Sequence, residues 1–209
     1  LEISMVFTVK EILQLEVTPS LGCTEPVAIA LGSAAAASLL PGRQIDQIEI
    51  WVDPNIYKNG MAVIIPGTGG MTGLDTASAV GAYGCDPHRG LEILETLDEP
   101  GLLKAQALLK QGRVKVNLLE DPGLHIKTII TCGQDTAASE VKELHNNIVS
   151  LSLNGKRIND SELLSKAARE HGKSAIALLE EWLMSLTLDD IFELLDEIDE
   201  EDLAYLKKG

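Results

Sequence analysis

An alanine-rich apolar run, Val27–Leu40, follows directly on the segment Gly22–Pro26, and this junction constrains the fold most strongly. Pro26 suits the first position of a helix, because its fixed φ fits there and its missing N–H would be unpaired anyway. Thr24 is predicted as the N-cap, and Glu25 places an acid at the positive end of the helix dipole. Small side chains allow other backbone to approach closely, so we expect a buried helix.

The junction also predicts chemistry at Cys23. A thiol among unpaired backbone N–H groups, at the positive end of a helix dipole, is stabilised as the thiolate, and its pKa moves from about 8.5 towards neutrality. The chemistry expected is a base or nucleophile beside a pocket for an anion. The alternative is an inert, buried cysteine beneath a helix cap.

Hydrophobic periodicity predicts an α+β fold in two parts. Residues 1–158 are expected to form a small mixed sheet with covering helices, and residues 159–209 show only helical spacing, as at the start of an all-helical domain. The expected elements include a polar loop over 54–60, a short buried strand over 61–65, a hairpin turn at Asn154-Gly155 and a helix over 160–170. Two further strands, over 114–119 and 124–131, are expected to be joined by a turn.

Composition narrows the classes of partner and compartment. The formal net charge is −15 and there is no basic stripe, so nucleic acids and anionic membrane surfaces are not expected as partners. No apolar run is long and continuous enough for a signal peptide or a membrane span. The three cysteines are widely spaced, which predicts neither a disulfide framework nor a metal site within this chain and fits a reducing cytoplasm.

Three polar, glycine-containing segments are expected to converge at one end of the sheet: 22–26, 55–60 and 66–73. Lys58 supplies a cation, Asn55 and Asn59 supply amides, and the third segment supplies free backbone N–H groups and the Thr68 hydroxyl. This predicts a pocket for a small anion such as an amino-acid carboxylate. The third segment is neither a P-loop nor a dinucleotide fingerprint, and no lysine lies in a setting typical of pyridoxal phosphate.

Four stretches carry a resemblance to a known family: SLGCTEPVAIAL (20–31), NIYKNGMAVIIPGTGG (55–70), LEIL (91–94) and HNNIVSLSLNG (145–155). They resemble the L-cysteine desulfidases, relatives of the iron–sulfur L-serine dehydratases. The resemblance implies that the chain is the N-terminal half of a cytoplasmic enzyme that converts L-cysteine to pyruvate, ammonia and H₂S without pyridoxal phosphate. It also implies a 4Fe–4S cluster as Lewis acid, with its ligands outside this chain.

In that family the cysteine of the Cys-Thr-Glu-Pro motif is taken as the proton acceptor, which implies a catalytic role for Cys23. The residues expected to bind substrate are Thr24, Glu25, Asn55, Lys58, Asn59, Gly60, Gly67, Thr68, Gly69 and His145. L-Cysteine and L-serine both remain open as substrate.

Two other functions remain open. The chain could be a non-catalytic amino-acid-binding module, or a thiol hydrolase in which Cys23, His145 and Asn146 form a triad. An apolar stripe on the final helix also predicts a partner surface, which a homo-oligomer would supply.

Overall fold

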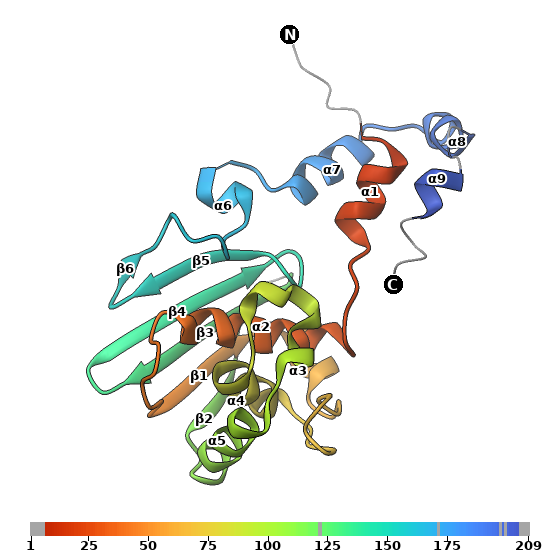
Figure 1. Ribbon diagram of the computed structural model, residues 1–209. Coiled ribbons are helices and arrows are strands. Elements are labelled where there is room, and N and C mark those ends of the chain that lie inside the picture. Colours follow the sequence, from red (N-terminus) through yellow and green to blue (C-terminus); the bar gives the residue numbers. More distant parts are fainter. Residues whose placement is uncertain (1–6, 121–122, 171, 197, 199, 205–209) are drawn as a thin grey trace. The chain divides into compact units, whose positions relative to one another are not determined.

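The computed structural model describes residues 7–120, 123–170, 172–196, 198 and 200–204 (Figure 1). The chain divides into two compact units: Ser20–Arg169, and Leu1–Pro19 together with Glu170–Gly209. A division after residue 158, expected from the sequence, stays a prediction.

A six-stranded sheet forms the frame of the larger unit, in the order β2-β1-β3-β4-β5-β6. Strands β1 and β2 are parallel, and every other neighbouring pair is antiparallel, so the sheet is mixed and the expected α+β class is confirmed. The strands are β1 (Gln47–Val52), β2 (Val114–Leu118), β3 (His125–Cys132), β4 (Asp135–Lys142), β5 (Ile148–Leu153) and β6 (Lys156–Arg157).

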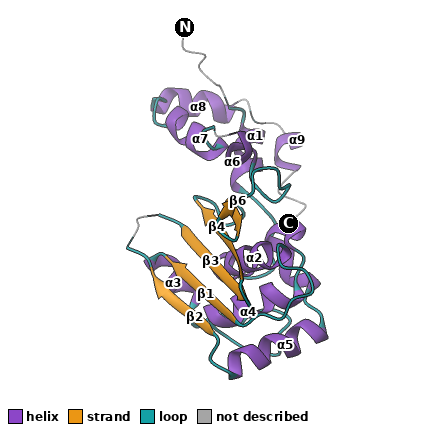
Figure 2. Ribbon diagram, turned by 90° about the vertical axis from the view of Figure 1, so that its left-hand side faces the viewer, coloured by secondary structure: helices purple, strands orange, loops and turns teal. Residues whose placement is uncertain are grey.

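Helices α2 (Thr24–Ser38) and α4 (Leu74–Gly84) cover one face of this sheet, and α5 (Glu99–Lys110) packs against α4 (Figure 2). Along β1 and β3, buried residues alternate with half-buried ones. This alternation is the pattern of a sheet with one face against the core and the other towards solvent. The solvated face expected for residues 45–52 is therefore confirmed.

Helix α2 lies at the centre of the larger unit, as its alanine-rich sequence predicts. Its residues from Pro26 to Ala36 are all buried. Two buried polar pairs lie inside this layer: the Ser33 and Ser78 hydroxyls lie 2.8 Å apart between α2 and α4. The Ser139 hydroxyl of β4 donates to the Gly32 carbonyl at 2.6 Å. These pairs satisfy polar atoms where α2 meets α4 and β4, whereas the buried Thr128 hydroxyl of β3 makes no hydrogen bond with the described residues.

The structure corrects two expected elements after β1. Residues 54–60 were expected as a loop, but Pro54–Gly60 forms helix α3. The cause is the pair Asp53-Pro54, because the Asp53 carboxylate accepts from two backbone N–H groups of the first turn and proline suits the first helical position. Residues 61–65 form no strand; Ile64 makes a single bridge to Thr72 and is 61% exposed.

Strands β2 and β3 are consecutive in the chain but not adjacent in the sheet, because each pairs with β1 from its own side. The turn expected between them falls partly on residues 121–122, which lie outside the described residues. The parallel β1–β2 pair requires a long crossover. That crossover contains α3, α4, the 3₁₀ helix η1 (Pro87–Thr96) and α5.

Helix α6 (Lys166–Glu170) spans the boundary of the two units. A helix was expected over residues 160–170, but only Lys166–Glu170 is helical. The smaller unit contains α1 (Val9–Glu16), α7 (Ala175–Leu183), α8 (Leu188–Asp196) and α9 (Glu200–Leu203), and the rings of Phe7 and Trp182 lie 5.4 Å apart within it.

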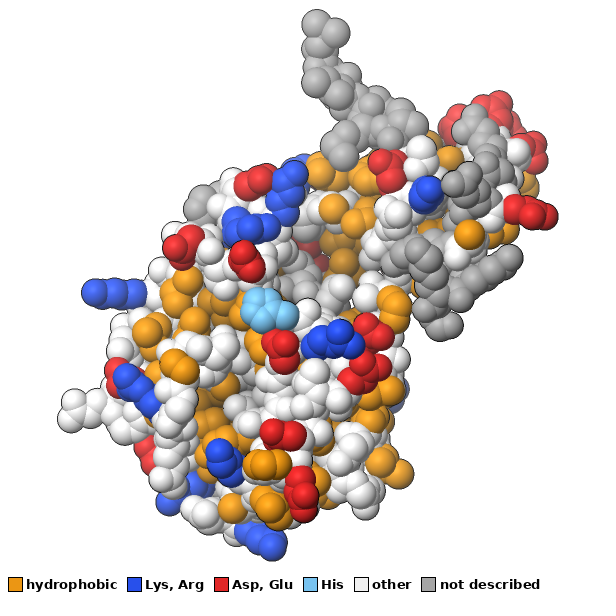
Figure 3. All heavy atoms as spheres, in the orientation of Figure 1, with side chains coloured by type: hydrophobic (Ala, Val, Ile, Leu, Met, Phe, Trp, Pro, Cys, Tyr) orange, Lys and Arg blue, Asp and Glu red, His pale blue; other side chains and the backbone are white. Residues whose placement is uncertain are grey.

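Acidic side chains gather over α8 (Figure 3). The apolar side chains of Leu188, Phe192 and Leu195 on the same helix are also exposed. Of the stripe expected on this helix (Ile191, Leu194, Leu195 and Ile198), only Leu195 is fully exposed. A homo-oligomer stays a prediction. Among the described residues, no helix combines the length and the apolar character needed to cross a lipid bilayer.

Candidate functional site

The sheet register brings distant segments to one end of the larger unit. Val52, the last residue of β1, lies opposite Ile126, and Lys142, the last residue of β4, lies opposite His125. Helix α3 and the β4–β5 connection, which contains His145, therefore leave the sheet at the same edge.

Close contacts at two glycines show that the segments 22–26 and 66–73 also lie at this end of the sheet. A side chain at Gly22 would meet Pro66, and one at Gly60 would meet Leu74 and the Cβ atom of Glu25. The start of α2, helix α3 and the 66–73 loop therefore lie side by side, as the sequence predicts.

Helix α2 begins one residue earlier than the predicted N-cap at Thr24 implies. Cys23, not Thr24, is the N-cap residue, and Pro26 is the third helical residue. The Cys23 side chain makes no capping bond to the helix backbone. Gly22 precedes it with φ +98°, a conformation that glycine adopts at little cost. The thiol is therefore half-buried and turned towards its neighbours rather than used as a cap.

One carboxylate connects the predicted segments. The Cys23 thiol donates to Glu25 Oε2 at 2.8 Å, and the Asn59 side-chain amide donates to Glu25 Oε1 at 3.0 Å. The Thr24 hydroxyl lies 3.5 Å from Glu25 Oε2. The two oxygens of Glu25 thus receive a thiol from α2 and an amide from α3.

The charge state of Cys23 is the reverse of the expected one. Burial and the hydrogen bond to the Glu25 carboxylate raise the pKa of the thiol, although the backbone N–H groups of Thr24 and Glu25 act in the opposite direction. Burial of Glu25 acts to raise its own pKa, but hydrogen bonds from Cys23, the backbone and Asn59 outweigh it, so that pKa is lowered. The resting pair is a thiol beside a carboxylate.

His145 faces the same acids. Burial lowers the pKa of its ring, while the charges of Glu25 and Asp53 act to raise it. A lowered pKa makes the neutral ring the main form at neutral pH, and neutral imidazole can accept a proton. The structure therefore brings His145 into the electrostatic range of Glu25, as expected for a residue of the site.

Asp53 is a supporting residue that the sequence reasoning missed. Its side chain is 1% exposed and accepts from the backbone N–H groups of Asn55, Ile56 and His125 at 2.9, 3.2 and 3.0 Å. It joins the start of α3 to the start of β3 and so fixes where Asn59 lies. The signal was present in the dipeptide Asp53-Pro54, which is typical of a helix start.

The glycine loop has a different role from the one expected for Thr68. This hydroxyl is buried; it donates to the Ile65 carbonyl at 2.7 Å and accepts from the Met71 N–H at 3.1 Å. Both bonds hold the loop, so Thr68 is positioned to shape it rather than to contact a ligand. Gly67 lies against Leu97, whereas nothing lies within 4 Å of the position a side chain would take at Gly69.

The remaining predicted residues all lie on α3. Asn55 and Lys58 are exposed, and Lys58 precedes Asn59 on the last turn. Among the described residues, neither side chain forms a hydrogen bond or an ion pair with Cys23 or Glu25. Gly60 is buried, and its lack of a side chain leaves room for the side chain of Leu74 at the start of α4. The structure therefore brings together Cys23, Thr24, Glu25, Asn59, Gly60 and His145, and leaves Asn55 and Lys58 at the rim of the site.

The described residues do not form a site for an iron–sulfur cluster. The three cysteines are free thiols that lie on separate elements: Cys23 at the start of α2, Cys85 at the end of α4 and Cys132 at the end of β3. Within the described part of the chain, no three His, Cys, Asp or Glu side chains are gathered closely enough to hold a metal. A 4Fe–4S cluster stays a prediction, and no chemical step is derived from it here.

The contact between Cys23 and Glu25 leads to a first prediction about thiol reactivity. Glu25→Gln removes the charge that helps to raise the Cys23 pKa, so the thiolate fraction at pH 8 should rise and iodoacetamide should label Cys23 faster than in wild type. Peptide mass spectrometry over a pH series measures the labelling rate of each cysteine.

Glu99→Gln is the matched control, since Glu99 is also an acid in the first turn of a helix of this unit. Cys85 should label slowly in all variants, because burial raises its pKa to about 12. An unchanged or slower Cys23 rate in Glu25→Gln would show that the carboxylate does not restrain the thiol.

Comparison with known proteins finds relatives along nearly the whole chain. A UPF0597 protein of Desulfotalea psychrophila is 54% identical over 205 residues, which is 98% of this chain and 47% of the relative. A UPF0597 protein of Geobacter sulfurreducens is 36% identical over 95% of this chain and 45% of its own length. UPF0597 protein YhaM of Salmonella gallinarum is 43% identical over 68% of this chain. No family model matches the chain.

These findings correct the family expected from the motifs. The expectation was the N-terminal half of an L-cysteine desulfidase, whereas the similar proteins are named UPF0597 proteins and match along 98% of this chain. The chain spans about half the length of the curated relatives that it matches. Their name states no activity, so the function must be argued from the site.

Proposed function

We propose that this relative of the UPF0597 proteins binds a small L-amino acid at the start of α2, where Cys23 acts as the base of an α,β-elimination. The substrates would be L-cysteine or L-serine, and the products pyruvate, ammonia, and H₂S or water. One observation carries the proposal: the carboxylate of Glu25 accepts both a thiol and an amide at the positive end of a buried helix.

Each group of an amino acid has a suitable partner in this arrangement. The ammonium group is suited to the Glu25 carboxylate, and the substrate carboxylate to the backbone N–H groups of Thr24 and Glu25 at the positive end of the α2 dipole. Asn59 holds Glu25 from the other side at 3.0 Å and so keeps the acid in place. Exposed Lys58 adds positive charge at the rim.

Binding of such a ligand would itself prepare the base. Glu25 helps to raise the Cys23 pKa, so an ammonium group that offsets its charge should favour loss of the thiol proton. Neutral His145 is suited to accept that proton. The thiolate would then take the α-proton while the C–H electron pair forms the Cα–Cβ double bond, and the leaving group departs with its own bonding pair and takes up the proton that His145 accepted. The resulting enamine would tautomerise to an imine, which one water molecule hydrolyses to pyruvate and ammonia.

A second function follows from the raised pKa of the Cys23 thiol. The resting Cys23 is a thiol rather than a thiolate, so the site could bind an amino acid without removing a proton. The chain would then be a non-catalytic amino-acid-binding module.

Both functions require ligand binding, and calorimetry with L-serine and L-lactate tests it. Lactate keeps the carboxylate but lacks the ammonium group that Glu25 is proposed to hold. L-Serine should bind wild type more tightly than L-lactate, and Glu25→Gln should weaken L-serine by about tenfold or more, since hydrogen bonds to charged groups contribute about 1.5–3 kcal/mol.

Glu99→Gln should leave the affinity for L-serine unchanged. Equal affinities for L-serine and L-lactate, or the absence of binding, would exclude both functions. A cytoplasmic location is proposed as well, because all three cysteines are free.

A further inference from the structure

A hollow lies beside the C-terminal end of α2, at the opposite end of this helix from Cys23. It has a volume of about 310 Å³ and is lined by residues of the α2–β1 connection, of α4 and of α5. We call it the Tyr83 pocket, and the residues used here are Arg43, Ile45, Tyr83, Lys104, Leu108 and Arg113. Since α2 has 15 residues and rises about 1.5 Å per residue, the two ends are about 22 Å apart.

Three cations surround this pocket in a chain whose net charge is −15. Arg43 forms an ion pair with Asp135, and Arg113 lies 4.0 Å from Asp46. Lys104 makes no hydrogen bond or ion pair with another residue of the described ranges. Its ammonium charge is therefore uncompensated, and the pocket is locally positive on an acidic protein.

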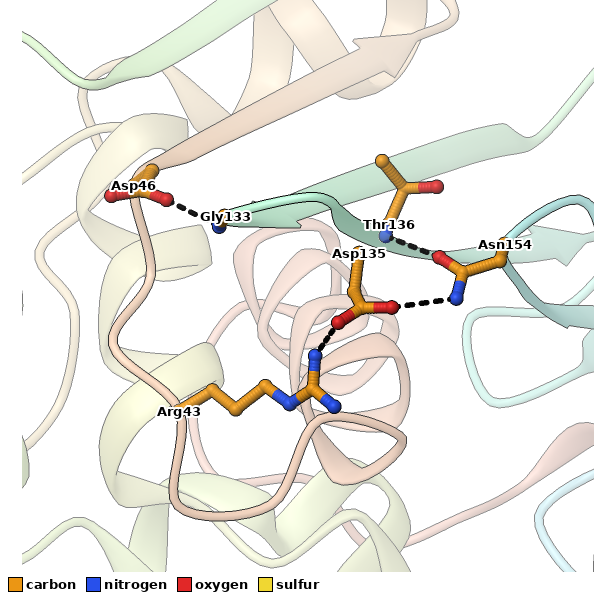
Figure 4. A network of polar contacts seen from close by, with 6 residues as sticks. All are labelled: Arg43, Asp46, Gly133, Asp135, Thr136 and Asn154. Carbon is orange, nitrogen blue, oxygen red and sulfur yellow. Dashed lines mark hydrogen bonds and ion pairs between the residues drawn. The ribbon is translucent and has the colours of Figure 1, made fainter.

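The acids beside the pocket are held in place by a polar network (Figure 4). Asp135 accepts from the Asn154 amide at 2.7 Å, and the Asn154 oxygen accepts from the Thr136 N–H at 2.8 Å. Asp46 accepts from the Gly133 N–H at 2.6 Å. Arg43 is thus oriented by an acid that is itself fixed to the β4 and β5 backbone.

The pocket also has an apolar side. Tyr83 is held there because its hydroxyl accepts from the Ile45 N–H at 3.2 Å. A smaller hollow of about 190 Å³ shares Arg43, Ile45, Tyr83 and Lys104 with the pocket and extends to Leu40 and Ile130. Both Leu40 and Ile130 belong to the buried core. A charged mouth therefore adjoins a recess with apolar residues in its wall.

We propose that the Tyr83 pocket binds a small organic anion. Its carboxylate or phosphate group would contact Lys104, Arg43 and Arg113, and its apolar body would lie against Ile45, Tyr83 and the recess. The volume lies at the lower end of the range for small-molecule sites, which limits the ligand to about the size of a substituted benzene ring.

Binding of four probes tests this site: benzoate, phenyl phosphate, inorganic phosphate and benzylamine. Benzoate or phenyl phosphate should bind wild type and shift the amide resonances of Gly42, Ile45 and Gly112 in ¹H–¹⁵N spectra. Comparison of the two probes distinguishes a carboxylate from a phosphate head. Inorganic phosphate should bind more weakly than phenyl phosphate, because it lacks the apolar body, and benzylamine should not bind.

The matched variants are Lys104→Gln and Lys110→Gln on α5. Both remove one exposed lysine charge, but Lys110 does not line the pocket. Lys104→Gln should lower the affinity for the anionic probe by about fivefold, which corresponds to the upper range for an exposed ion pair. Lys110→Gln should bind the probe with the wild-type affinity. The proposal fails if neither aromatic anion binds, if benzylamine binds equally well, or if the two variants weaken binding alike.

Discussion

Replacing Cys23 by alanine should reduce pyruvate formation from L-cysteine or L-serine by at least about a hundredfold. General-base catalysis contributes about 10² to 10⁴ to a rate, and the thiol is the group proposed to take the α-proton. The affinity for L-serine should persist, because Glu25 and Asn59 keep their own contact. A coupled lactate dehydrogenase assay measures pyruvate, and calorimetry measures binding.

Cys85→Ala is the control, because Cys85 is a half-buried thiol at the end of α4, far along the chain from Cys23. It should leave both quantities unchanged. Pyruvate formation at the wild-type rate by Cys23→Ala would refute the role of base. L-Serine binding without pyruvate formation by wild type would support the binding-module function instead.

Replacing Gly81 by alanine should lower the free energy of unfolding of the larger unit by roughly 3 kcal/mol. A Cβ atom at this position of α4 would lie 2.3 Å from the Ala30 carbonyl oxygen and 2.6 Å from the Ala30 Cα atom of α2. These are backbone atoms of a buried helix, so no side-chain rotation can relieve the overlap. The helices must separate, and contacts throughout the core weaken.

Urea unfolding measures this effect best in a Trp182→Phe background. Trp51 on β1 is then the remaining tryptophan, so its fluorescence reports on the sheet alone. Gly172→Ala is the control, because nothing lies within 4 Å of the added atom there. It should change the free energy of unfolding by less than about 0.5 kcal/mol. A midpoint in Gly81→Ala equal to that of Gly172→Ala would contradict the close approach of α2 and α4.

Local patterns predicted the elements whose cause is local. The buried α2 follows from small and apolar residues on every side of the helix. The β5–β6 turn follows from Asn154-Gly155, which adopt φ +51° and +75° as a two-residue hairpin turn requires. Helix α3 was missed although its signal was local too: Pro54 was assigned to a polar loop over residues 54–60, whereas Asp53-Pro54 is a helix start.

Non-local pairing was not predictable in the same way. Strands β2 and β3 follow one another in the chain, yet β1 lies between them. Periodicity states which residues of a strand face the core, but it does not state which strand is the neighbour.

By itself, the sequence determined that a cysteine and an acid stand at the start of a buried helix, and that three polar segments accompany a mixed sheet. Only the tertiary structure decided whether Cys23 and Glu25 are protonated and which side chains lie next to them. The helix dipole alone predicts a thiolate at Cys23, but burial and the side chain of Glu25 reverse that direction. Likewise, Arg43, Lys104 and Arg113 surround one pocket only because the sheet brings segments 60 residues apart together. Charge and solvation depend on neighbours in space, and those are set by the packing of the whole unit.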